Sequence, residues 1–153
     1  MSTHYKGTKK EILALTTWIK LARANNTVFS KIKPSMVKHN LTKSQFGVME
    51  ALMHLGPMSQ RDIGDKLLMT GGNIVKIIDN LEREGLVFRT ANKADRRAYK
   101  ILLTEMGSKI IDSIFPNHVK SIVETFSNLS TDEQIELGRL CKKLGIGLDT
   151  NKT

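Results

Sequence analysis

The chain has 153 residues, and 40% of them are hydrophobic, which is enough for one buried core and too few for two independent ones. We therefore expect a single domain over residues 1–153. Lysine and arginine together number 24 against 15 acidic residues, and the formal charge of +9 favours a polyanionic partner, either nucleic acid or an acidic membrane surface. No apolar run approaches the roughly 20 residues that span a bilayer, and the N-terminus lacks the apolar segment of a signal peptide, so we expect a cytoplasmic protein with no membrane partner.

A long helix is expected from Thr8 to about His39, because no glycine or proline interrupts the chain before Pro34. Its apolar residues fall on two stripes, one formed by Ile12, Leu15, Ile19 and Ala22 and the other by Trp18, Leu21, Val28 and Ile32. One stripe can serve the domain's own core, and the other needs a partner. We therefore predict an obligate dimer that forms through residues 8–35 and 115–145.

Three shorter helices are expected next. The first begins at a capping box in residues 42–45 and stops at Gly56-Pro57, and the second restarts at residues 59–62. After a break at residues 69–72, the third runs from about Gly72 to Glu84, with apolar residues at i, i+3, i+4 and i+7. Gly85 follows at the place where a helix commonly ends in a left-handed residue.

The period then changes from helix to strand. Residues 86–90 and 99–103 are typical of two short strands, and a polar, basic hairpin loop joins them. Thr104 can cap a further helix, which Pro116 kinks or interrupts, and a last helix begins at a capping box in residues 130–133 and ends at Gly145. The pattern predicts a mainly α fold, a winged helix-turn-helix with a two-stranded β wing between N- and C-terminal dimerisation helices.

The third short helix carries the best candidates for reading DNA bases. A helix that opens at Thr70, Gly71 and Gly72 presents free backbone N–H groups and a positive dipole end to a phosphate, and two glycines allow close approach. Asn73 and Lys76 face outward in its first turns, where a recognition helix reaches base edges in the major groove. The alternative is that Thr70 and Asn73 only cap the helix and that Lys76 is a solvated charge.

The hairpin supplies charges suited to phosphate neutralisation and to insertion of an arginine into the minor groove. Its basic residues surround a single acid and are Arg89, Lys93, Arg96, Arg97 and Lys100, with Asp95 as the acid. Gln60 and Arg61, early in the second short helix, are expected to touch backbone phosphate. An ordinary charged hairpin and a solvated helix surface are the respective alternatives.

Residues 95–104 also resemble the D-x-R-x-x-x-x-x-L-T wing signature of the MarR family of transcription regulators, at the position that the family uses. The resemblance covers nearly the whole chain. It implies a homodimeric, ligand-released repressor on a pseudo-palindromic operator, with residues 8–38 and 105–147 as dimerisation helices and residues 42–104 as the DNA-binding module. In the wing it implies that Asp95 orients the loop and that Arg97 reaches the DNA.

The same resemblance implies a pocket for a small, aromatic or phenolic effector between the dimer helices and the module, for which we single out Trp18, Phe115 and His118. Residues 114–118 and 140–145 are similar to a subgroup associated with quinone-like electrophiles. The only cysteine, Cys141, lies in the last helix, whereas the family's peroxide sensors carry theirs near the N-terminus, so we expect an inert thiol.

Other chemistry is poorly supported. The four histidines have no HxxxH or HxxH spacing, and the sequence has no catalytic triad, paired carboxylates or phosphate-binding loop, so we expect no metal, no cofactor and no enzyme activity. Two subunits could still build a metal site jointly. The competing function is an architectural, nucleoid-organising protein that binds DNA with little sequence choice and has no effector, because the positive charge supports both readings equally.

Overall fold

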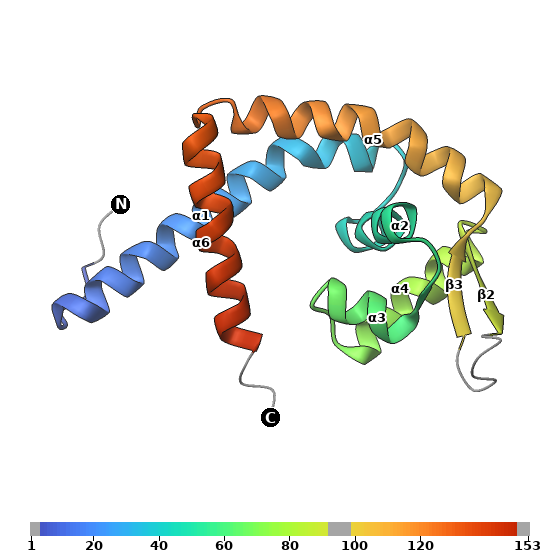
Figure 1. Ribbon diagram of the computed structural model, residues 1–153, viewed down its shortest axis with the longest axis horizontal. Helices are drawn as coiled ribbons and strands as arrows, with labels where there is room; N and C mark the ends of the chain where they lie inside the picture. The colour runs from blue at the N-terminus through green and yellow to red at the C-terminus, as the bar shows by residue number, and fades with distance from the viewer. Residues whose placement is uncertain (1–3, 92–98, 150–153) are drawn as a thin grey trace.

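The computed structural model describes residues 4–91 and 99–149. In these ranges the chain forms helices and three short strands in the order α1 (Lys9–Val37), α2 (Lys43–Leu55), β1 (Met58–Ser59), α3 (Gln60–Lys66), α4 (Gly71–Arg83), β2 (Val87–Ala91), β3 (Tyr99–Leu103), α5 (Glu105–Phe126) and α6 (Thr131–Asp149). Figure 1 shows α2 to β3 gathered at one end of the molecule, with α5 running from this end back along α1. The predicted mainly α, winged arrangement is confirmed.

Local capping fixes where the helices begin. The Thr8 hydroxyl accepts from the Glu11 N–H, and the Glu11 carboxylate accepts from the Thr8 N–H at 2.7 Å. The same reciprocal pair joins Thr42 to Gln45 before α2, and Ser130 is bonded to the third residue of α6 in this way. Each box satisfies two donors that a helix start would leave unpaired, which is why these starts could be predicted from the sequence.

Three details differ from the sequence prediction. The sheet has a third strand, in the order β1-β3-β2, because Met58 and Ser59 pair antiparallel with Ile101 and Lys100. Two residues are too few to show an alternating pattern, so the sequence predicts only β2 and β3. The last helix continues past Gly145 to Asp149, since glycine in a helix costs only about 1 kcal/mol. Helix α5 continues through Pro116 without interruption.

The core lies inside the part formed by α2 to β3 and the first half of α5, which we call the winged module. Its fully buried side chains include Met49, Ile63, Ile74, Ile78, Leu81, Ile101 and Ile111. Gly107 shows how tightly α5 docks, because a Cβ at this position would lie 2.0 Å from the Leu86 carbonyl oxygen. Only glycine fits there, and the close approach fixes α5 against the strand that follows α4.

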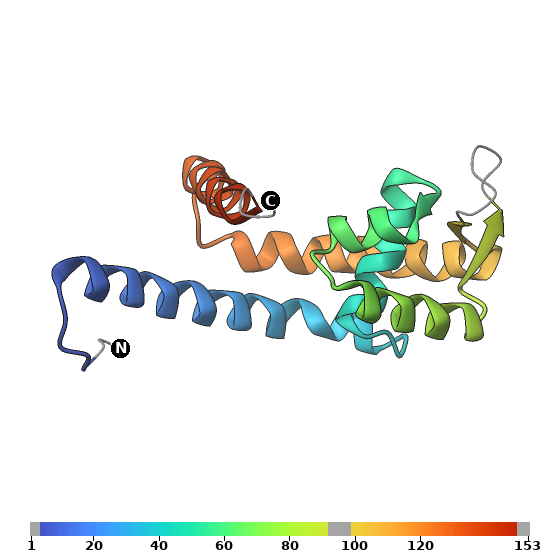
Figure 2. The ribbon, with the colours of Figure 1, turned by 90° about the horizontal axis from the view of Figure 1, so that it is seen from below.

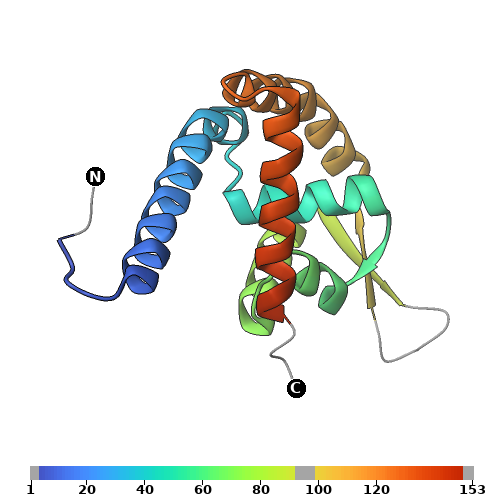
Figure 3. The same cartoon turned by 60° about the vertical axis from the view of Figure 1, so that its left-hand side comes forward.

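The first part of α1 and the whole of α6 form a second region, which we call the arm helices. Figure 2 shows the first part of α1 extending away from the winged module and α6 lying apart from the module, and Figure 3 shows α6 separate from the first part of α1. Every residue of α6 from 131 to 145 is exposed, and large apolar side chains such as Trp18 and Ile135 are 62% and 66% exposed. Across residues 4–91 and 99–149, no helix combines the length and apolar character needed to cross a membrane.

Candidate nucleic-acid interface

Helix α4 has one buried face and one free face. Ile74, Ile78 and Leu81 are buried and anchor the inner face in the core of the winged module. Asn73 and Lys76 are both exposed, one and two positions from the anchor Ile74. Because a helix turns by about 100° per residue, this anchoring directs the amide and the ammonium group away from the protein.

The start of α4 is open. Thr70 has the extended backbone of an N-cap residue, but its side chain makes no capping hydrogen bond, so the interpretation of Thr70 as a plain cap is not supported. Gly71 and Gly72 are exposed, and a Cβ at either position would meet nothing within 4 Å. The chain's own packing therefore does not require these glycines, although each weakens the helix. They leave room for a partner to approach the first backbone N–H groups closely.

Helix α3 packs on α4 as the first helix of a helix-turn-helix pair. Gln60 is half-buried at its first position, and Arg61 next to it is exposed. Arg61 lies 3.8 Å from the Asp65 carboxylate, and both side chains are largely in solvent. Such an exposed pair contributes little to stability, so Arg61 can exchange its partner for a phosphate at small cost.

Arg89 on β2 differs from the sequence prediction of a DNA contact. Its guanidinium pairs with the carboxylates of Asp79 and Glu82 on α4, and only 23% of the Arg89 side chain is exposed. Burial by itself lowers the pKa of Arg89, but the hydrogen bonds and charges of the two acids outweigh it and raise the pKa above its ordinary value. Two of the five guanidinium N–H groups of Arg89 thus donate to acids on α4. Periodicity could not reveal this, because the partners lie on a different element.

The other predicted wing residues, Lys93, Asp95, Arg96 and Arg97, lie outside the described residues. Lys100, at the described end of the hairpin, is exposed on β3.

A cavity of about 280 Å³ lies between α1, α2, α5 and the turn that precedes α4. It is lined by Phe29, Ile32, Met36, Lys43, Ser44, Phe46, Gly47, Glu50, Leu67, Met69 and His118. The His118 ring is buried, 4.6 Å from the centroid of the Phe46 ring, and its Nδ1 lies 3.3 Å from the Ser35 hydroxyl. Burial lowers the pKa of His118 more than the charge of Glu50 raises it.

The three residues predicted for an effector pocket do not all meet. Phe115 packs edge-on to His54 and lies 6.2 Å from the His118 ring, beside the cavity and outside its lining. Trp18 does not join His118 within one chain. It precedes Ser35, the neighbour of His118, by 17 residues of α1, which is about 25 Å of helix. Phe46 and Glu50 on α2 do line the cavity. Sequence reasoning took Phe46 for a core position on the apolar stripe and did not single out Glu50.

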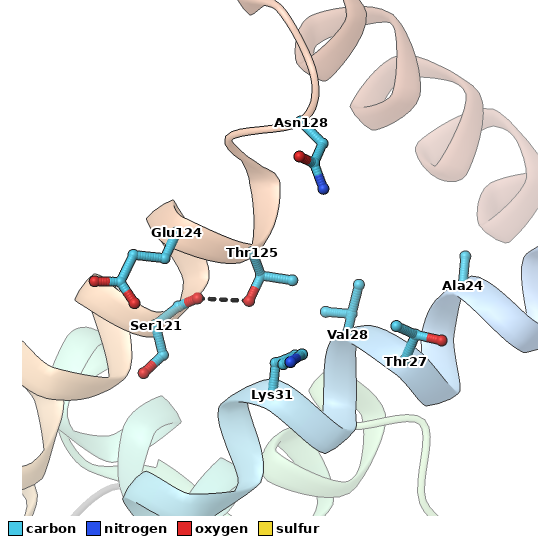
Figure 4. Close-up of a pocket in the computed structure, with 8 residues that line it drawn as sticks. All are labelled: Ala24, Thr27, Val28, Lys31, Ser121, Glu124, Thr125 and Asn128. Atoms are coloured by element: carbon cyan, nitrogen blue, oxygen red, sulfur yellow. Dashed lines mark hydrogen bonds between the residues drawn. The ribbon is translucent and has the colours of Figure 1, made fainter.

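A second hollow, of about 590 Å³, lies between α1 and α5 near the arm helices (Figure 4). Thr27, Val28 and Lys31 line it from α1, and Glu124 and Thr125 from α5. The Thr125 hydroxyl bonds back to the Ser121 carbonyl at 2.6 Å, which leaves the hollow's wall regular and helical. Sequence reasoning did not predict this feature. In the described ranges, no group of three His, Cys, Asp or Glu side chains is arranged to hold a metal ion.

Comparison with known proteins places this geometry in a family. A sequence profile of the MarR family matches residues 39–98. The chain belongs to the MarR family and is a DNA-binding transcriptional regulator with a winged helix-turn-helix.

Two relatives from Bacillus subtilis (strain 168) cover most of the chain. The uncharacterised HTH-type transcriptional regulator YkoM is 36% identical over 133 residues, which are 87% of this chain and 86% of the relative. The HTH-type transcriptional regulator MhqR is 34% identical over 133 residues, 87% of this chain and 92% of the relative. The structure of a variant of MarR from E. coli complexed with operator DNA has the same fold, with a TM-score of 0.76, 23% identity, and coverage of 91% of this chain and 99% of that one.

Proposed function

We propose that this chain is a homodimeric repressor that binds an inverted-repeat operator and is released from it by a small aromatic effector. In this proposal residues 42–104 bind DNA, and residues 8–38 and 105–147 form the dimer, so that the whole chain works as one unit. The open start of α4 carries the proposal. The packing of the chain does not require glycine at positions 71 and 72, and Asn73 and Lys76 are exposed beside them.

The division of labour at the DNA follows from the chemistry of the side chains. In this proposal the exposed Asn73 and Lys76 reach base edges, where a good bidentate contact discriminates by roughly 1–3 kcal/mol. Gln60, Arg61 and Thr70, together with the wing residues Lys93, Asp95, Arg96 and Arg97, are assigned to phosphate and minor-groove contacts that fix register. Twofold symmetry would place two copies of α4 in successive major grooves about 10 base pairs apart.

The arm helices support the dimer. A monomer that leaves Trp18, Ile135 and Leu140 between 47% and 66% exposed has an apolar surface without a cover. The hollow of Figure 4 lies beside these helices and offers a second copy a concave seat on α1 and α5. A second copy covers both features at once, in the self-complementary manner of a twofold interface.

The cavity at His118 supports a neutral phenolic effector. Ser35 donates its hydroxyl proton to the Ile32 carbonyl at 2.7 Å, so its oxygen is left to accept from the His118 Nδ1–H. Nε2 then carries the lone pair. Among the described residues Ser35 is the only hydrogen-bond partner of His118, so Nε2 is left to bond to a ligand in the cavity that His118 lines.

The size and walls of the cavity suit one aromatic ring. An engineered apolar cavity of about 150 Å³ holds benzene, and this one measures about 280 Å³ with mostly apolar walls. The Nε2 lone pair and the Glu50 carboxylate would each accept a hydrogen bond from a phenol or hydroquinone hydroxyl. This chemistry agrees with the quinone-related subgroup that residues 114–118 and 140–145 resemble.

The cavity also shares a wall with the turn before α4, which gives the effector a route to the DNA interface. Leu67 and Met69 line the cavity, whereas Leu68 between them is 75% exposed and has a φ of +52°. This left-handed conformation is costly for a leucine, and it turns both neighbours toward the cavity. A ligand that displaces Leu67 or Met69 would move the start of α4, two residues further on.

The test is selection of bound fragments from genomic DNA, followed by titration of the selected site and of random duplex at one salt concentration. A specific regulator prefers its site by about 10³-fold or more, whereas an architectural protein, the alternative that the charge of +9 favours, binds both within a few fold. A hydroquinone should then release the protein from the selected site. The matching dimethyl ether, which has no hydroxyl group to donate a hydrogen bond, should not. His118→Phe should abolish the response to the hydroquinone while leaving DNA binding in place.

A further inference from the structure

The junction between α4 and the wing contains three charged side chains that pair with one another. Asp79 and Glu82 lie three residues apart on α4 and therefore on one face of the helix. The Arg89 guanidinium reaches both carboxylates from β2, with one terminal nitrogen on each. The Arg89 backbone N–H also donates to Glu82 Oε1 at 3.1 Å. One residue of the wing is thus held to one face of α4 by three hydrogen bonds.

The side chains that form these bonds are less exposed to solvent than those of an ordinary surface ion pair. The Arg89 side chain is 23% exposed, and those of Asp79 and Glu82 are 46% and 38% exposed, whereas the pair of Arg61 and Asp65 is 90% and 68% exposed. A planar guanidinium that spans two carboxylates fixes direction as well as distance. The group therefore constrains the angle between α4 and the hairpin.

That angle matters for DNA recognition. The base-reading candidate Lys76 lies three residues before Asp79 on the same helix, and the hairpin begins with the strand that carries Arg89. Phosphate contacts of a wing fix the register of the protein on the duplex, and base contacts of a recognition helix depend on that register. Without Arg89, moreover, α4 would present two uncompensated carboxylates next to a polyanion.

We propose that Arg89 is a positioning residue for DNA recognition, which acts through Asp79 and Glu82 to set the recognition helix against the wing and does not itself contact DNA. This inference rests on the proposed role of α4 in reading bases.

The decisive variant is the double substitution Asp79→Asn with Glu82→Gln, which releases Arg89 and keeps its charge. If Arg89 positions the helix, affinity for the selected site falls by about tenfold, which is the lower end of what one good base contact supplies. Affinity for random duplex does not fall, because two negative charges have been removed. If Arg89 were a phosphate contact held back by the acids, its release would strengthen binding to both duplexes, and that result would overturn the proposal.

A matched control removes two carboxylates that do not touch Arg89. Glu105→Gln with Asp112→Asn makes the same change in net charge on exposed positions of α5. This variant should strengthen binding to both duplexes alike and keep their ratio. An equal loss of ratio in the control would mean that charge alone accounts for the effect, and it would also overturn the proposal.

Arg89→Ala supplies an independent readout. Each lost phosphate contact lowers the magnitude of the salt slope by about 0.9, so a direct contact in each subunit of a dimer predicts a decrease of about two. A positioning residue predicts weaker binding to the selected site, and neither a further loss nor a change in slope when Arg89→Ala is added to the Asp79→Asn, Glu82→Gln variant, in which no carboxylate is left uncompensated. Circular dichroism and the sedimentation coefficient establish that each variant is folded and assembled as the wild type.

The two hypotheses fail in different ways. If the wild-type protein does not discriminate between its selected site and random duplex, the proposed function is wrong. If the wild type discriminates and the Asp79→Asn, Glu82→Gln variant does so equally well, only the role of Arg89 is wrong.

Discussion

The winged module and the arm helices both carry apolar residues at helical spacing, but these residues are buried in the module and exposed on the arm helices. In the module Ile63 and Ile78 are fully buried, whereas on the arm helices Leu13 and Ile135 are 69% and 66% exposed. An apolar stripe thus predicts that a surface will be covered, but it does not say whether the cover comes from the same chain. In the proposed dimer, the exposed apolar side chains of the arm helices are the surface that a second copy covers.

The largest expected effect comes from charging the arm helices. Leu140→Glu with Leu144→Glu should raise the dimer dissociation constant by at least 100-fold, because an unpaired charge in an interface costs about 3 kcal/mol or more. Sedimentation over a range of protein concentrations measures the change. Leu55→Glu is the control, since Leu55 on α2 is 57% exposed, close to the 53% of Leu144. A double variant that sediments like the wild type would show that α6 contributes nothing to assembly.

A second effect compares one substitution in the two regions. Gly107→Ala should destabilise the fold by at least 1–3 kcal/mol, because its Cβ would overlap the Leu86 backbone and not a movable side chain. Gly138→Ala on α6 has open space within its own chain and should stabilise the helix by about 1 kcal/mol. Urea unfolding of both variants measures these free energies. A loss at Gly138 that grows with protein concentration would locate the partner's surface on that face of α6.

The same contrast explains how much could be predicted from the sequence. Helix starts at Thr8, Thr42 and Ser130 were predictable because a capping box is written in four consecutive residues. The end of α4 was predictable because a helix commonly ends in a left-handed glycine, and Gly85 does adopt a positive φ of +70°. These are local devices, and the chain specifies them without help from its tertiary structure.

Features that depend on distant elements were missed. The two-residue strand β1 exists only because β3 presents a free edge to it. Arg89 reads as a wing cation until the structure brings it to α4, and Trp18 reads as a neighbour of His118 until the length of α1 separates them. The open start of α4 could be predicted only in part. The sequence shows the two glycines, but it does not show that the space beside them is left unfilled by the rest of the chain.

The smallest expected effect is a dependence of stability on pH at the boundary of the two regions. Burial lowers the pKa of His118 below its unfolded value of about 6.5, so the fold favours the neutral ring. Stability from this group is therefore present above pH 6.5 and lost as the pH falls through the folded pKa. His118→Gln should flatten the curve of unfolding free energy between pH 7 and 5, with the exposed His54→Gln as control. An unchanged curve for His118→Gln would contradict this assignment.

The most direct test of the account concerns its central claim, that sequence choice resides in the first turns of α4. Asn73→Ala, Lys76→Ala and, for comparison, Arg61→Ala on α3 are titrated against the selected site, its single-base mutants and random duplex at one fixed salt concentration. We predict that Asn73→Ala and Lys76→Ala lose discrimination worth roughly 1–3 kcal/mol at particular base pairs, whereas Arg61→Ala weakens binding to every duplex by the same factor. If Asn73→Ala and Lys76→Ala also lose one common factor on all duplexes, α4 is not the recognition helix.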